Sequence, residues 1–233
     1  MKNGWMVLSG ELQREMQLVY DNLLQMAHEL ESPLRELVFA QVNAAQPYLR
    51  AGVVLAAGYD EPDSSALQMA RVHLATAIEM LYVALSIHRL LMPYDGATPD
   101  EDPNKTVLGS TILAGDYCFS QSAIMAACTE NPAVVAIFAK ALQDVSESQL
   151  RQIFDINDVP AQITKTLFQA GGSAAAILRQ ASASTTEFLV ALSQQFACSV
   201  QNLDAASDLA PSIHQSPLPA PLKQRWLQII QLA

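Results

Sequence analysis

The sequence predicts an all-α protein, on three observations. Apolar residues recur at intervals of three and four along most of the chain, which is the spacing of amphipathic helices. Several prolines stand where such stretches begin, because the first helical position does not need the missing N–H. No stretch alternates apolar and polar residues with the β-branched and aromatic enrichment of a strand. We therefore expect about eight or nine helices of roughly 12–28 residues in a single domain over residues 1–233.

Proline and capping residues predict where these helices begin. The five predicted starts are Pro33, Pro47, Pro132, Pro160 and Pro221. Two of them follow a capping side chain, Ser32 and Asn131, and the run Ser184–Glu187 has the pattern of a capping box.

Between these marks the apolar stripes run, in chain order, over 12–30, 67–88, 113–127, 134–145, 163–174 and 188–200. The most apolar long window, Leu74 to Met92, also carries charges that would be costly in lipid, so we expect a buried helix of a soluble bundle and no membrane span. Two segments are expected to be loops: an acidic one over 93–105 and a proline-rich one over 209–221.

Composition narrows the function classes. A hydrophobic share of 51% with 15% charged residues excludes disorder and coiled coil. The net charge of −10 disfavours binding to nucleic acid or to an anionic membrane surface. Three cysteines, Cys118, Cys128 and Cys198, show no zinc spacing and no disulfide framework, so the expected compartment is reduced and cytoplasmic.

Two runs carry a resemblance to a known family: Ala75-Thr-Ala-Ile-Glu-Met-Leu-Tyr-Val-Ala-Leu-Ser-Ile-His88 and Thr111-Ile-Leu-Ala-Gly-Asp-Tyr117. They resemble the helices AAAIELIHTASLVHDDxxD and AVLAGDYLL of the trans-polyprenyl diphosphate synthases. Leu49-Arg50 and Lys165-Thr166 resemble further motifs of that family, and residues 200–208 resemble its FQxxDDxxD motif. The matching structural marks are His88, Gly115, Asp116, Tyr117 and Gln201.

The resemblance implies an isoprenoid-synthase helical bundle, truncated at the C-terminus relative to the family. In that family two aspartate clusters hold Mg²⁺ around an allylic diphosphate, and basic residues bind isopentenyl diphosphate. Magnesium suits this role because it takes oxygen ligands and bridges phosphates. The corresponding candidates are Asp204 and Asp208 for the metal, and Arg50, Arg89 and Lys165 for diphosphate.

The sequence departs from the family at the motifs that bind metal and diphosphate. Arg89-Leu-Leu-Met-Pro93 stands where the family has DDxxD, Pro47 replaces a lysine, and Ala205 replaces the middle acid of the second cluster. Within the family the chain most resembles the small non-catalytic component of two-component heptaprenyl or hexaprenyl diphosphate synthases. Aspartates four positions apart, such as Asp204 and Asp208, are more often a solvated helix face than a metal site.

The resemblance therefore leads us to expect a non-catalytic subunit in isoprenoid biosynthesis that pairs with a catalytic prenyltransferase. Two alternatives stay open: a divergent but active prenyl diphosphate synthase, and a stand-alone helical protein that binds an isoprenoid. The helix Thr106–Cys128 is apolar on more than one side, which predicts a dimer with a catalytic homologue or with a second copy. We expect Asp116, in that helix, to be satisfied by a neighbouring polar group.

Overall fold

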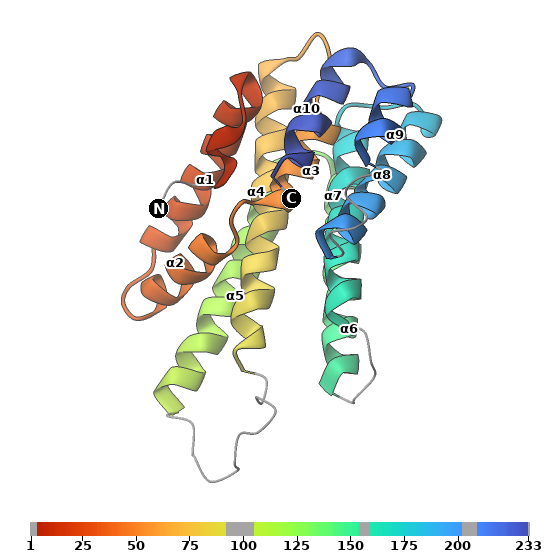
Figure 1. Cartoon of the computed structure of the whole chain (residues 1–233). Coiled ribbons are helices and arrows are strands. Elements are labelled where there is room, and N and C mark those ends of the chain that lie inside the picture. The colour runs from red at the N-terminus through yellow and green to blue at the C-terminus, as the bar shows by residue number, and fades with distance from the viewer. Residues whose placement is uncertain (1–3, 92–104, 154–158, 202–208, 233) are drawn as a thin grey trace.

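The computed structural model describes residues 4–91, 105–153, 159–201 and 209–232. These ranges hold a short 3₁₀ turn, ten α-helices and no strand, which confirms the all-α class (Figure 1). The helices are α1 Gly10–His28, α2 Leu34–Ala44, α3 Leu49–Ala57, α4 Ser65–Arg89, α5 Lys105–Ala127, α6 Pro132–Ile153, α7 Val159–Leu178, α8 Ala183–Gln201, α9 Leu209–Gln215 and α10 Ala220–Ile230. The number exceeds the predicted eight or nine because several segments are shorter than expected, down to seven residues in α9.

Helix α4 is the centre of the bundle. It packs along α5 and contacts α1, α2, α3 and α7, while α7 lies between α6 and α8 (Figure 1). Among the described residues α4 is also the one helix long and apolar enough to cross a membrane, but 78% of that apolar window is buried inside the bundle. The prediction that this segment is a buried core helix is confirmed.

The proline-rich segment 209–221 was wrongly predicted to be a loop. Its first seven residues form α9, and Pro221 lies in the first turn of α10. Leu209, Ile213 and Leu218 are buried, so apolar contacts hold the segment in the bundle despite its prolines. The predicted acidic loop 93–105 lies outside the described residues except for its last residue, which begins α5.

The predicted helix caps had mixed outcomes. Asn131 does cap α6, because its side-chain oxygen accepts hydrogen bonds from two backbone N–H groups of the first turn, at 3.0 and 3.4 Å. Helix α8 is capped by Ser182 instead of Ser184, through a 3.2 Å bond from the N–H of Thr185. Ser32 does not cap α2, whose N-cap is Pro33 without a side-chain bond.

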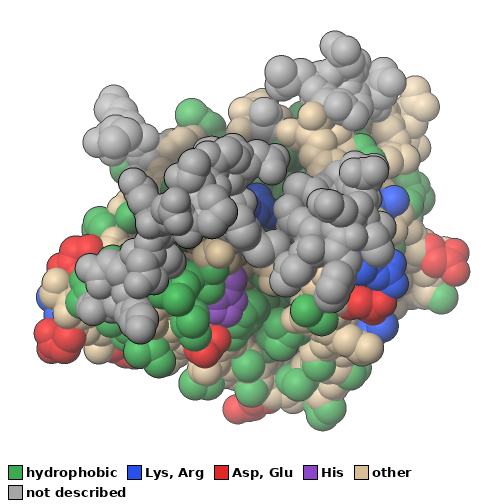
Figure 2. Space-filling model, turned by 90° about the horizontal axis from the view of Figure 1, so that it is seen from below, with side chains coloured by type: hydrophobic (Ala, Val, Ile, Leu, Met, Phe, Trp, Pro, Cys, Tyr) green, Lys and Arg blue, Asp and Glu red, His purple; other side chains and the backbone are tan. Residues whose placement is uncertain are grey.

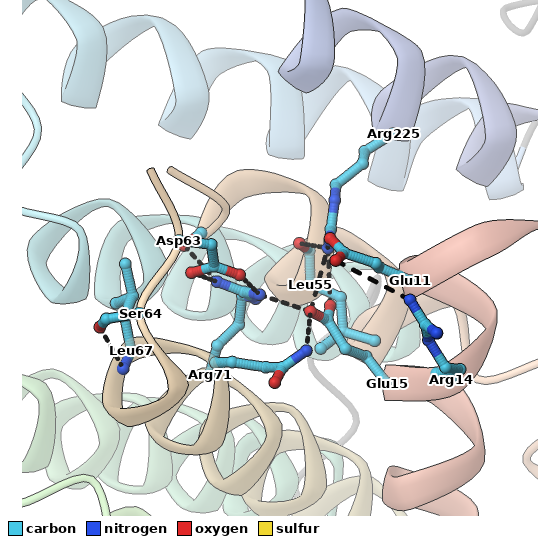
Figure 3. A network of polar contacts seen from close by, with 11 residues as sticks. Glu11, Arg14, Glu15, Leu55, Asp63, Ser64, Leu67, Arg71 and Arg225 are labelled. Atoms are coloured by element: carbon cyan, nitrogen blue, oxygen red, sulfur yellow. Dashed lines mark hydrogen bonds and ion pairs between the residues drawn. The ribbon is translucent and has the colours of Figure 1, made fainter. Parts of the chain in front are cut away.

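A buried network of charges ties α1, α4 and α10 together at the end of the bundle remote from the start of α5 (Figures 1 and 3). The carboxylate of Glu15, with no exposed surface, accepts from Arg71 at 2.5 Å and from Arg225 at 2.6 Å. Arg71 also donates to Asp63 at 2.7 Å. Burial alone would lower the pKa of Arg71, but the bonds to Asp63 and Glu15 raise it above its ordinary value.

Helix α10 is fixed to the centre by this network and by close packing on α3. Arg225 donates to the carbonyl of Leu55 in α3 at 3.2 Å, and its guanidinium lies 3.9 Å from the Tyr59 ring centroid. Gly52 allows the approach, since a Cβ there would lie 2.8 Å from Cδ1 of Ile229.

Candidate functional site

The first candidate, Arg50, lies in the first turn of α3 and faces α4. Tyr48 positions that turn, because it takes a left-handed backbone conformation (φ 62°) and its buried hydroxyl donates to the carbonyl of Val42 at 3.0 Å. Desolvation raises the pKa of the Tyr48 hydroxyl, so this hydroxyl remains a donor. Tyr48 therefore fixes the backbone from which the Arg50 side chain extends.

Arg50 is held by two residues of α4. Its Nε donates to Oε2 of Glu79 at 3.0 Å, and Nη2 lies 3.0 Å from the same oxygen. The guanidinium carbon is 3.5 Å from the ring centroid of Tyr82. Glu79 is fully buried and its other oxygen accepts from the N–H of Ala51 at 2.9 Å. The pair thus joins α3 to α4, with the Arg50 side chain 9% exposed.

The motif search missed Glu79 and Tyr82. The available signal was the carboxylate itself: an acid in the middle of the most apolar segment needs a partner when it is buried. What the sequence could not give was the identity of that partner, which lies 29 residues earlier.

Helix α4 ends at the second candidate. Arg89 is its last residue and Leu90 its C-cap, and both side chains are exposed. These are the positions at which the family has its first two aspartates. Within the described ranges Arg89 forms no ion pair, and no group of three or more His, Cys, Asp or Glu side chains could hold a metal ion. A guanidinium and an aliphatic side chain do not bind Mg²⁺, so Arg89 and Leu90 cannot serve as magnesium ligands in place of two aspartates.

The structure brings together three of the sequence marks, His88, Gly115 and Asp116. Nε2 of His88 lies 3.4 Å from Oδ1 of Asp116, and its ring packs at 5.0 Å from that of Phe119. The contact depends on Gly115, because a Cβ at that position would overlap the imidazole. Asp116 has the polar neighbour that we expected, although its side chain is 63% exposed.

Tyr117 completes the explanation of the Gly-Asp-Tyr triplet. Its hydroxyl donates to the carbonyl of Met26 at 2.9 Å and contacts the carboxylate of Glu29 at 3.1 Å. Burial and this carboxylate raise the pKa of the hydroxyl. In this chain the triplet therefore fixes α5 against α4 and against the end of α1.

Of the remaining candidates, the structure describes Lys165, Thr166 and Gln201. Lys165 is exposed and lines a cavity of about 590 Å³ between α7, α8 and α9, together with Gln194 and Cys198. Thr166 lines a different groove of about 600 Å³ between α6 and α7. Gln201 is exposed at the last position of α8, and Asp204 and Asp208 lie outside the described residues.

One surface feature stands out on α5. Helix α5 carries a row of mostly exposed residues, here called the outer face of α5. The row consists of Gly109, Ile112, Leu113, Asp116, Ser120, Ala123, Ile124 and Ala127. Ile112, Leu113 and Ile124 of this row are 42–60% exposed. Seen from below, toward the end of the bundle where α5 begins, a histidine has hydrophobic side chains on two sides (Figure 2).

Comparison with solved structures defines the fold. The chain superposes on a geranylgeranyl pyrophosphate synthase from Lactobacillus brevis ATCC 367 with a TM-score of 0.67, at 20% identity over 85% of this chain and 64% of that one. A heptaprenyl diphosphate synthase from Staphylococcus aureus gives a TM-score of 0.66, at 17% identity over 88% of this chain and 67% of that one. The chain thus has the isoprenoid-synthase fold.

Sequence comparison points the same way. No family model matches the chain. It is similar to solanesyl diphosphate synthase 1 of Arabidopsis thaliana, at 23% identity over 222 residues, and to solanesyl-diphosphate synthase 2 of Oryza sativa subsp. japonica, at 24% over 227 residues. These matches cover 88% of this chain but 54% and 56% of the relatives, so the chain spans just over half their length. The resemblance to the trans-polyprenyl diphosphate synthases is confirmed.

Proposed function

We propose that this chain is a non-catalytic subunit in isoprenoid biosynthesis that pairs with a catalytic polyprenyl diphosphate synthase, in the cytoplasm. The observation that carries the proposal is the end of α4. The fold and the helix are kept, yet Arg89 and Leu90 occupy the positions of two aspartates that the family uses to hold magnesium. A cation there repels metal ions.

The state of Arg50 agrees with this role. The family uses the equivalent arginine to grip diphosphate, but here two of its three nitrogens are engaged by Glu79 and its face covers Tyr82. Breaking a buried ion pair to free the arginine would cost about 3–5 kcal/mol. Its proposed task is to hold α3 against α4, and any contact with diphosphate would use the remaining nitrogen.

The test is turnover of isopentenyl and farnesyl diphosphates with Mg²⁺ by the purified chain, alone and with a catalytic synthase from the same source. We expect no product from the chain alone and a change in rate or product length when the two are combined. The control is the double variant Arg89→Ala, Leu90→Ala, which should behave like the parent, because a non-catalytic subunit does not need the diphosphate candidate Arg89 for turnover.

Each other outcome identifies an alternative. Turnover by the chain alone at about 1 per second, abolished by changing Asp204 and Asp208 to Asn, would establish a divergent active synthase and overturn the proposal. Magnesium would then be held by those two acids. Tight binding of an isoprenoid with no effect on any synthase would establish a stand-alone binding protein.

A further inference from the structure

We draw no further inference here: the strongest candidate, the apolar groove of about 330 Å³ where Pro33 and Leu37 at the start of α2, Leu90 at the end of α4 and Val107 in the first turn of α5 meet, carries none because nothing in the described part of the chain shows what covers it.

Discussion

Replacing Arg225 by methionine removes a buried charge while keeping most of the apolar length of the side chain. The guanidinium donates to both oxygens of Glu15, at 2.6 and 3.3 Å, and to the carbonyl of Leu55 at 3.2 Å. Breaking a buried ion pair costs about 3–5 kcal/mol. Because Glu15 keeps its bond to Arg71, we expect a loss of about 3 kcal/mol in the free energy of unfolding, at the lower end of that range.

Urea denaturation at pH 7, followed by circular dichroism, measures this loss. In a thermal scan it corresponds to a fall in Tm of about 6–12 °C for a domain of this size. The matched control is Glu11→Ala. Glu11 lies on the same helix as Glu15 and contacts the same arginine at 3.5 Å, but its side chain is 50% exposed. Its removal should cost about 0.5 kcal/mol.

The comparison between the two variants tests whether the burial of Glu15 determines how much the network contributes to stability. If Arg225→Met and Glu11→Ala lowered the free energy of unfolding by similar amounts, the buried position of Glu15 would not be what makes the network matter. If the slope of free energy against urea changed as well, partial unfolding of α10 would have to be separated from the global transition.

Two further predictions concern α5. Gly115→Ala should lower the free energy of unfolding by about 1–3 kcal/mol, because the new Cβ overlaps the His88 ring of α4. Gly109→Ala on the same helix should raise the free energy of unfolding by about 0.5–1 kcal/mol, since nothing lies within 4 Å of the new Cβ. Equal effects of the two changes in thermal melts would contradict the packing described for the triplet. In thiol labelling of the folded chain at pH 8, Cys118 should react far more slowly than the exposed Cys128 and Cys198, since burial raises the pKa of its thiol to about 12; three equal rates would show that α5 opens readily.

Local signals in the sequence predicted the helices well. The cap at Asn131 and the apolar stripe of α4 each depend on residues within one or two turns, and both were confirmed. The proline count misled at 209–221, because burial of Leu209 and Ile213 outweighs the local preference for a loop. At the start of α8, Ser182 and Ser184 are both good caps, and the sequence alone does not choose between them.

The candidate site was predictable only in part. The motif order located His88 and Asp116, which do meet, but it did not reveal that Arg50 is held by Glu79. Charge pairs between distant segments follow from the packing of whole helices, which no local pattern encodes. The same holds for Glu15, whose partners come 56 and 210 residues later.

The distance along the chain between Arg71 and Arg225, the two partners of Glu15, has a consequence for how the protein is made. On a ribosome adding about 5–20 residues per second, Arg225 is synthesised roughly 8–30 seconds after Arg71. During that interval α1 and α4 can already meet through Glu15 and Arg71, but the groove that α10 will fill over α3 stays open. The nascent chain therefore exposes part of its core until α10 emerges, and this interval is when a chaperone would bind it most usefully.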